Sequence, residues 1–543
     1  MRRLTLAALL FPLAACTVDS GPGSGPYPGA DVEHLITAAS IAGHIRFLSD
    51  DLLEGRGVAT RGDELARRYI ATQFETFGLQ PGGPDDSWEQ QVPMMGLTAE
   101  VTKPLTVRAG SETISFSAPT DYTAESGHLE PTSAWSGAEI VFVGFGIHAP
   151  EQDWDDFKDV DVAGKVLMVM NNDPAGDPSL FAGDMRLYYG RWSYKFEEAA
   201  RRGAVGCIVI HTTPSAGYPF QVIQNTHGHE SFWLPFKEDE PTMAVRSWCS
   251  EEAARQIATL GGHDLDALRR TAETREFRPV SLGVTADLEL TNTIRELTSA
   301  NVIGKIEGSD LADEAVIVTA HFDHLGVGTE KSGDSIYNGA LDNGSGTAAL
   351  IALAQACAAL PTKPRRTILF AAVTAEESGL LGSLYYARNP TFQTEKIIAN
   401  YNMDSINIWG ATRDIAMIGH GKNSLTELAT AVAERRDREL VPNPDVSLGL
   451  FYRSDHFSFA RQGIPSAYFK SGKDFYEDAE AKSAVMNAYT DVRYHQPSDE
   501  YSADWDLRGA VADTQLLLEC LLTTAGQDEP AKWAPGDEFE KRR

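Results

Sequence analysis

The feature that most constrains the fold is a regular alternation of short apolar runs with helical segments after about residue 280. The apolar runs have the length of buried strands and lie at residues 315–320, 367–373, 397–403 and 466–470. The helical segments are predicted at residues 346–360, 379–387, 424–436 and 512–525. This alternation is typical of a layered α/β domain with a largely parallel sheet. Functional side chains in such sheets gather beyond the carboxyl ends of the strands.

The chain upstream of this region has a different pattern. Residues 133–279 contain strand-like runs at 138–147, 165–171 and 205–211 and a helix predicted at 195–204, with no convincing cluster of metal ligands. We therefore expect a β-rich covering or interaction domain there. Before it, apolar residues spaced by three and four predict an amphipathic helix that ends at Gly78, and residues 85–130 predict short strands and turns.

Three predicted strands end in residues that can bind metals or move protons. His321 and Asp323 follow the first strand, Glu376 and Glu377 follow the second, and Asp404 follows the third. Side chains alternate along an extended chain, so His321 and Asp323 share one face, where a carboxylate can hold an imidazole that binds a metal. Two adjacent carboxylates in an apolar setting indicate a nearby cation or a raised pKa. Each motif alone also fits an ordinary solvated loop.

Two further residues complete a possible ligand set. Asp342 lies in GALDNGSG at the start of a predicted helix, where it could equally be a helix cap, and His495 lies in VRYHQPSDE. Two imidazoles and three carboxylates can hold two zinc ions that share one carboxylate. Two such ions, about 3.5–4 Å apart, acidify a water molecule between them. Glu376 is then the natural general base and acid.

The N-terminus predicts export. Two arginines precede an apolar run from Leu4 to Ala15, which is too short to span a bilayer. The run ends in LAAC, which is similar to the bacterial lipobox, in which the cysteine, here Cys16, carries the lipid. Because Thr17 follows, the resemblance implies an outer-membrane lipoprotein that faces the periplasm or the cell surface. A plain signal peptide is the alternative.

Charge and cysteine content narrow the partners. The chain has 77 Asp and Glu against 47 Lys and Arg, a net charge of −30. Such a field repels nucleic acids and favours cationic or zwitterionic ligands. The five cysteines show no CxxC spacing, and the sequence leaves open whether Cys207 and Cys249 form a disulfide.

The ordered motifs AHFDH, GALDNGSG, AEESG, NMDS and RYHQPSD resemble metallopeptidase family 28, the co-catalytic zinc aminopeptidases, with an inserted protease-associated domain. The strings SDDLLEGR (49–56) and FYRSDHFSFARQGIPS (451–466) are also similar to that family. The resemblance implies a three-layer α/β/α zinc-peptidase domain of the phosphorylase/hydrolase-like kind, with a mostly parallel mixed sheet, plus the inserted β-rich domain.

The resemblance also implies a role for each residue. It implies two Zn²⁺ ions per chain, held by five ligands: His321, Asp404, Glu377, His495 and the bridging Asp342. Glu376 would be the proton shuttle, Asp323 would orient His321, and Tyr452 would stabilise the oxyanion. Asp455 is expected in the wall of the site, but helix capping or ordinary loop packing fits Asp455 and Tyr452 equally well. His324 and His420 are expected to be structural or to lie at the rim.

The function implied is removal of N-terminal residues from peptides by a hydroxide that bridges two zinc ions. Glutaminyl cyclase-like activity and carboxypeptidase activity are alternatives on the same fold, and a binding protein without metals is a third. A serine hydrolase is disfavoured because the GxSxG motif is missing around Ser345. Side-chain preference and oligomeric state cannot be deduced from the sequence.

These patterns divide the chain into six segments. They are a lipoprotein signal peptide (1–15), a flexible tether (16–31), an N-terminal part of the peptidase domain (32–131), the inserted protease-associated domain (132–279), the zinc peptidase domain (280–527) and a polar tail (528–543). The only membrane contact expected is through lipid on Cys16.

Overall fold

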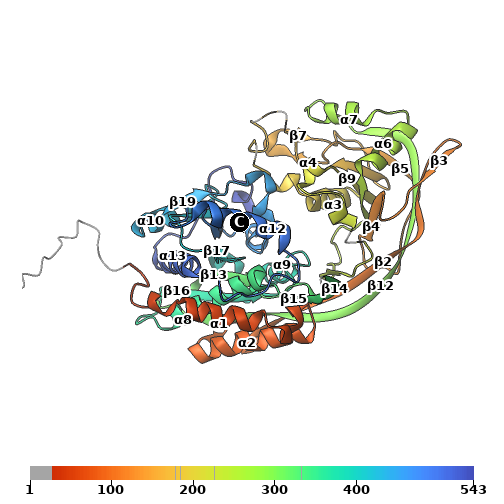
Figure 1. The fold of residues 1–543 in the computed structure, drawn as a ribbon. Coiled ribbons are helices and arrows are strands. Elements are labelled where there is room, and N and C mark those ends of the chain that lie inside the picture. The colour runs from red at the N-terminus through yellow and green to blue at the C-terminus, as the bar shows by residue number, and fades with distance from the viewer. Residues whose placement is uncertain are drawn as a thin grey trace, which may run out of the picture.

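The computed structural model describes residues 27–175, 177, 179–183, 185–224, 227–331 and 333–542. The expected signal peptide, Cys16 and most of the tether lie outside these residues. Among the described residues, no helix combines the length and the apolar character needed to cross a bilayer. The chain forms two lobes that are joined along one side by a long curved β-ribbon (Figure 1).

The first lobe is built on the predicted α/β sheet. Its central strands run parallel: β13 (Leu311–His321), β16 (Arg366–Val373), β17 (Ile397–Asn402) and β20 (Ser466–Ser471). Strands β16 and β17 are buried throughout, β13 is buried from Ala315 onward, and β20 is partly buried. The sheet is mixed at its edges, where β18 (Asp414–Ile418) pairs antiparallel with β20 and β19 (Glu439–Pro442) pairs parallel with β18. The mostly parallel mixed sheet predicted from the sequence is therefore confirmed.

Helices cover both faces of this sheet and make three layers. One face packs against α1 (Ala38–Leu48), α2 (Arg61–Phe77), α8 (Gly346–Ala358), α10 (Leu425–Arg435) and α13 (Arg508–Gly526). The other face packs against α9 (Leu381–Arg388) and α11 (His456–Ala460) through Tyr386 and Phe459. Helix α8 is apolar all round, as expected for a helix enclosed between the sheet and other helices.

The second lobe contains a further group of parallel strands. The strands are β5 (Thr132–Phe142), β8 (Val166–Met170), β9 (Gly206–His211) and β11 (Val245–Ser250), and β4 (Tyr122–Ser126) pairs antiparallel with β11. Helices α3 (Trp192–Arg201), α6 (Glu251–Leu260) and α7 (Leu265–Ala272) accompany the sheet. Because β4 precedes residue 132, this sheet begins upstream of the predicted insertion, whose boundaries stay a prediction.

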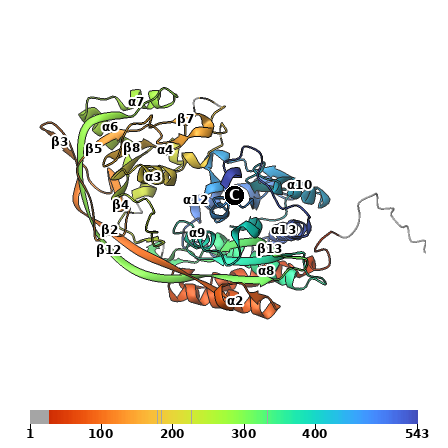
Figure 2. The same ribbon diagram turned by 180° about the vertical axis from the view of Figure 1, so that it is seen from behind.

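The ribbon that joins the lobes consists of two unusually long antiparallel strands. Strand β2 (Glu89–Ala109) pairs with β12 (Val280–Ile306), and both curve along the outside of the molecule (Figure 2). The N-terminal part of β12 pairs with β5 in the second lobe, whereas its C-terminal part pairs with β16 in the first. One continuous sheet therefore runs through both lobes. Cys207 and Cys249 are buried and free, so they form no disulfide.

The C-terminal segment packs against the first lobe. The indole N–H of Trp533 donates to the carbonyl of Gly463 (2.8 Å), and Phe539 is only 1% exposed. The Phe539 ring lies against Phe451 and Phe457, at centroid distances of 5.9 and 6.2 Å. The segment expected to be a polar tail thus contributes apolar side chains to the core.

Replacing Phe539 by alanine should therefore destabilise the protein by about 3–5 kcal/mol, because a buried aromatic side chain is lost and a cavity remains. Urea unfolding followed by tryptophan fluorescence measures the change. Lys541→Ala, two residues away and exposed, should change the midpoint little. Equal midpoints for the two variants would contradict the packing described here.

Candidate metal centre

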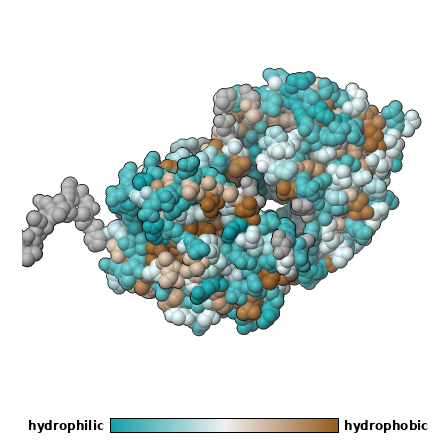
Figure 3. Space-filling view, viewed as in Figure 1, coloured by the Kyte–Doolittle hydropathy of each residue, from teal (hydrophilic) through white to brown (hydrophobic). Residues whose placement is uncertain are grey.

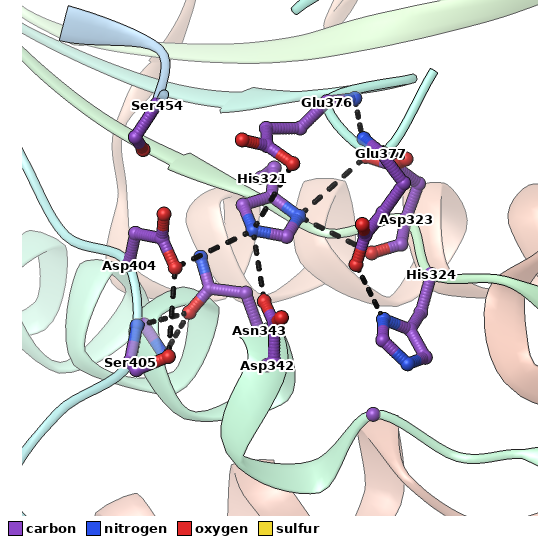
Figure 4. Close-up of polar contacts among 12 residues, drawn as sticks. His321, Asp323, His324, Asp342, Asn343, Glu376, Glu377, Asp404, Ser405 and Ser454 are labelled. Atoms are coloured by element: carbon purple, nitrogen blue, oxygen red, sulfur yellow. Dashed lines mark hydrogen bonds and ion pairs between the residues drawn. The ribbon is translucent and has the colours of Figure 1, made fainter. Parts of the chain in front are cut away.

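Acidic and imidazole side chains converge beyond the carboxyl ends of three neighbouring strands (Figure 4). His321 is the last residue of β13, Glu376 and Glu377 follow β16, and Asp404 follows β17. These strands are adjacent and parallel, so their carboxyl ends meet at one edge. The Nε2 atom of His321 lies 3.7 Å from Asp404 Oδ1 and 3.9 Å from Glu376 Oε2.

Asp342 lies between the two histidines of the predicted ligand set. Its Oδ1 atom is 3.3 Å from His321 Nε2, and its Oδ2 atom is 3.4 Å from His495 Nε2. His495 Nε2 also lies 2.9 Å from Glu377 Oε2. Each oxygen of Asp342 therefore faces a different group, one containing His321 and Asp404 and the other containing Glu377 and His495. We call these five residues with Glu376 the carboxylate cluster.

The donor atoms fit a metal centre. The ligand atoms of His321, Asp342 and Glu377 lie within 4.8 Å of one another, as do those of His321, Glu376 and Asp404. The Nε2 atoms of His321 and His495 are buried and make no hydrogen bond of good geometry. Buried polar atoms normally have partners, so converging donors of this kind favour cation binding.

Electrostatics in the cluster favour positive charge at two places. Burial alone would lower the pKa of His321, but the charge of Glu376 and contacts with neighbouring carboxylates raise it well above its usual value. Burial also opposes the charge of His495, yet Glu377 and Asp342 raise its pKa to about 10. Burial raises the pKa of Glu376 well above the usual range, and nearby carboxylates add to this rise. Each histidine is thus a place where the cluster stabilises a cation.

Asp323 holds the strand ends together. Its carboxylate accepts the backbone N–H groups of Glu376 (3.1 Å) and Glu377 (3.3 Å), and its Oδ1 atom lies 3.7 Å from Nδ1 of His321. It therefore fixes the backbone of both glutamates and lies beside the imidazole that it was predicted to orient.

Asp455 and Tyr452 lie differently with respect to the cluster. Asp455 is fully buried, and His321 and Asp404 both influence its pKa, which burial raises to about 7. The hydroxyl of Tyr452, in contrast, donates to the Glu538 carboxylate, and its ring packs among aromatic side chains. This hydroxyl is therefore not directed at the cluster, contrary to its predicted role.

Tyrosine and lysine side chains approach the cluster from β20. The Tyr468 hydroxyl and the Lys470 ammonium group both donate to the backbone carbonyl of Asp404, at 2.7 and 3.0 Å. Their positions could not be deduced from the sequence, because the string SAYFK predicts only an apolar strand.

Three other supporting residues were not assigned to the site from the sequence. His324 Nδ1 lies 2.7 Å from Glu377 Oε1, so His324 orients this glutamate. The buried guanidinium group of Arg56 donates to the carbonyls of Phe322 and Gly339, behind the cluster. The buried Asp499 accepts the backbone N–H groups of residues 341 and 342. The strings SDDLLEGR and RYHQPSDE contain Arg56 and Asp499, but nothing in them reveals these contacts.

Asp499 offers a test of this support. Replacing Asp499 by alanine leaves the N–H groups of Leu341 and Asp342 buried without their acceptor, which should destabilise the fold by about 1–3 kcal/mol. Because the sequence resemblance implies that Asp342 is a zinc ligand, its shift should also weaken zinc binding about 10–100-fold. Chelator competition measures the affinity, and Ser498→Ala is the neighbouring control. Unchanged zinc affinity would contradict this role.

Comparison with known families identifies the region that contains the site. Residues 301–518 match the model of Peptidase family M28. This range includes all five predicted ligands and Glu376. The M28 match supports a hydrolase of the metallopeptidase class.

Individual relatives agree with the M28 match over part of their length. Aminopeptidase YwaD of Bacillus subtilis (strain 168) is 30% identical over 207 residues, which are 37% of this chain and 40% of the relative. Probable leucine aminopeptidase 2 of Aspergillus fumigatus is 28% identical over 228 residues, 40% of this chain and 42% of the relative. The chain thus spans less than half the length of these curated relatives.

The fold is shared more widely than the sequence. The solved structure of an aminopeptidase from Aneurinibacillus sp. strain AM-1 aligns over 94% of this chain and 98% of its own, with a TM-score of 0.50 and 20% identity. The likeness at this identity concerns the fold alone.

Proposed function

We propose that this chain is an exported zinc-dependent aminopeptidase that removes N-terminal residues from peptides. The observation that carries the proposal is Asp342, whose two oxygens each face a different histidine, at 3.3 and 3.4 Å. A carboxylate in this position suits a bridge between two cations. The M28 match over residues 301–518 supports the same class of enzyme.

The ligand assignment follows the two groups around Asp342. His321 and Asp404 would hold one zinc ion, Glu377 and His495 would hold the other, and Asp342 would be shared. Imidazole nitrogen and carboxylate oxygen are common zinc ligands. Bound zinc would supply a Lewis acid for the peptide carbonyl and would make water a better nucleophile near neutral pH.

Glu376 is the residue proposed to move protons. Its Oε2 atom lies 3.9 Å from His321 Nε2, beside the proposed ligands. Glu376 is not one of the five proposed ligands, so its carboxylate is available for proton transfer. A carboxylate there can take a proton from water and give it to the leaving amine. The hydrogen bonds that Asp323 accepts from the backbone of Glu376 and Glu377 hold the backbone of Glu376 in place.

The charge of the whole chain supports a free amino terminus as the recognised end of the substrate. Two bound Zn²⁺ ions would balance the four acidic side chains Asp342, Glu376, Glu377 and Asp404, but the chain as a whole carries −30. Such a field attracts an ammonium group and disfavours a terminal carboxylate at the same place. Aminopeptidase action is therefore favoured over carboxypeptidase action.

A glutaminyl cyclase-like reaction is the main alternative, and it would use one zinc ion. Elemental analysis of purified protein separates the two, because two zinc ions per chain favour the peptidase and one favours the cyclase. A chain that binds no zinc would favour a binding protein instead.

The cellular location is part of the proposal. The charged and apolar start of the sequence and the LAAC string support export and lipid attachment at Cys16, with the enzyme facing the periplasm or the cell surface. Labelling with a radioactive fatty acid tests this, with Cys16→Ala as the control. The proposal fails if both chains take up label equally.

The activity itself is tested with a panel of aminoacyl-p-nitroanilides. We expect turnover with zinc, loss of turnover with a chelator and recovery when zinc is returned. N-acetylated forms of the same substrates should not be cleaved. Cleavage of acetylated substrates, or activity in the chelated enzyme, would contradict a zinc aminopeptidase.

A further inference from the structure

One contact between the lobes joins residues 186–191 of the second lobe to residues 446–453 of the first. The backbone N–H of Arg186 donates to the carbonyl of Val446 (3.3 Å), and the rings of Tyr188 and Tyr452 have centroids 6.0 Å apart. A Cβ atom added to Gly449 would lie 3.2 Å from Cδ of Arg186, so this side chain lies against the loop of the first lobe.

Three arginines gather at this contact: Arg186 and Arg191 from the second lobe and Arg453 from the first. Burial lowers the pKa of Arg191 to about 10, with the charge of Arg453 as the next cause. Burial also lowers the pKa of Arg186; the charge of Asp173 opposes this, and the charge of Arg453 adds to it. The three positive charges are therefore close enough to repel one another.

Of the three arginines, Arg186 is influenced electrostatically by the carboxylate of Asp173, but no carboxylate among the described residues is a main influence on the pKa of Arg191. Within the ranges that the structure describes, none of the three makes an ion pair with a carboxylate at 4.0 Å or less. Arg186 donates to the carbonyl of Ser215, whereas the buried Nε atoms of Arg191 and Arg453 make no hydrogen bond to any described residue. Buried charge without a partner is unfavourable, and acidic residues outnumber basic ones in this chain. The arrangement favours an anionic ligand.

The chain connects Arg453 directly to residues at the carboxylate cluster. Arg453 immediately precedes Ser454, whose hydroxyl accepts from Asn402 (2.7 Å) and lies near Asp404 (Figure 4). Asp455, two residues after Arg453, interacts electrostatically with His321. Since neighbouring Cα atoms are about 3.8 Å apart, the backbone of Arg453 lies within about 8 Å of that of Asp455. The surface is hollowed between the two lobes (Figure 3).

We propose that Arg186, Arg191 and Arg453 bind the C-terminal carboxylate of a short peptide whose amino terminus lies at the carboxylate cluster. This inference rests on the proposed aminopeptidase function and adds the class of substrate, namely zwitterionic peptides of a few residues. Guanidinium groups bind carboxylates through paired, charge-assisted hydrogen bonds. Because an extended residue spans about 3.3–3.6 Å, the separation between the two charged regions limits the length of peptide that reaches both.

The test compares a peptide with its C-terminal amide. For the wild-type zinc enzyme, kcat/KM for Leu-Gly-Gly should exceed that for Leu-Gly-Gly-amide by about 10–100-fold, as expected for a hydrogen bond between charged groups. Arg191→Gln should remove most of this difference, mainly by raising KM for the acid. Turnover of the amide and of leucine p-nitroanilide should stay within about twofold of wild type.

Arg191 is the preferred site for substitution because it belongs to the second lobe and not to the loop that contains Asp455. Arg191→Lys keeps the charge but not the paired geometry, so it should retain part of the preference. Arg270→Gln, on the outer helix α7, is the matched control and should behave like wild type. If Arg191→Gln does not fold, the ratio of kcat/KM for Leu-Gly-Gly to that for its amide, measured in the wild type and in Arg191→Lys, still tests the inference.

Two results would overturn the inference. One is a wild-type enzyme that hydrolyses Leu-Gly-Gly and its amide with equal kcat/KM. The other is an Arg191→Gln enzyme in which kcat/KM falls by the same factor for both substrates. Failure of the aminopeptidase proposal looks different, because leucine p-nitroanilide would then not be cleaved at all. In that case, calorimetric binding of Leu-Gly-Gly and its amide to the zinc-loaded protein still reports on the arginines.

Discussion

The Glu376→Gln enzyme is expected to bind zinc normally and to lose about 10²–10⁴-fold in kcat. Glutamine has nearly the same shape as glutamate but cannot accept a proton, so it removes the proposed base and leaves the surrounding contacts in place. The backbone N–H of residue 376 still donates to Asp323 in the variant. Stopped assays with leucine p-nitroanilide measure kcat, and elemental analysis measures zinc.

The neighbouring residue provides the control for this prediction. Glu377 lies 2.9 Å from His495 Nε2 and is proposed as a ligand, so Glu377→Gln should lose zinc as well as activity. The two substitutions are at adjacent positions, and both should lower activity, but only Glu377→Gln should also lower the zinc content. A Glu376→Gln enzyme with wild-type kcat and full zinc content would remove Glu376 as the base.

Replacing Asp342 by asparagine is expected to reduce bound zinc from two ions per chain to one or none. An amide has one carbonyl oxygen and no negative charge, so it cannot serve both groups as the carboxylate does. Loss of one centre should lower kcat/KM at least about 10³-fold, since a catalytic metal contributes several kcal/mol. The stoichiometry is measured after gel filtration in zinc-free buffer.

A matched control exists at the opposite end of the central strand. Asp313, in β13, is exposed and forms an ion pair with Lys396, so Asp313→Asn should keep both zinc ions and full activity. The Asp342→Asn chain should still fold, because the backbone contact between Asp342 and Asp499 does not involve the Asp342 side chain. Two zinc ions in Asp342→Asn would contradict the shared position of this carboxylate.

The sequence predicted the first lobe well because its strands are local and apolar. Residues 315–320, 367–373 and 397–403 lie within or nearly coincide with β13, β16 and β17, and runs that are buried on both faces are easily recognised. The same rule placed His321, Glu376 and Asp404 at neighbouring strand ends, where the structure brings them together.

The ribbon was not foreseen, for physical reasons. Residues 85–130 were expected to form short strands and turns, yet β2 extends over 21 residues. Pro93 and Pro104 lie within β2, and proline within a run argues against a strand. Its stability comes from pairing with β12, nearly two hundred residues away, which no local pattern reveals.

The supporting residues of the site escaped prediction for a related reason. Arg56 and Asp499 act through backbone groups of residues that are distant in sequence, such as Phe322 and Leu341. A lone arginine or aspartate in a loop has many possible roles. Only the folded arrangement shows that these two side chains are buried beside the cluster.

The continuous pairing of β2 with β12 also governs how the lobes can move. Along the ribbon, no short linker separates the lobes, because both long strands extend from one lobe into the other. Domain closure in many enzymes turns on a few residues that absorb the whole rotation. Here a change in the angle between the lobes must instead be spread as a slight bending over many hydrogen-bonded pairs of β2 and β12. The width of the hollow between the lobes should therefore vary gradually and within a narrow range.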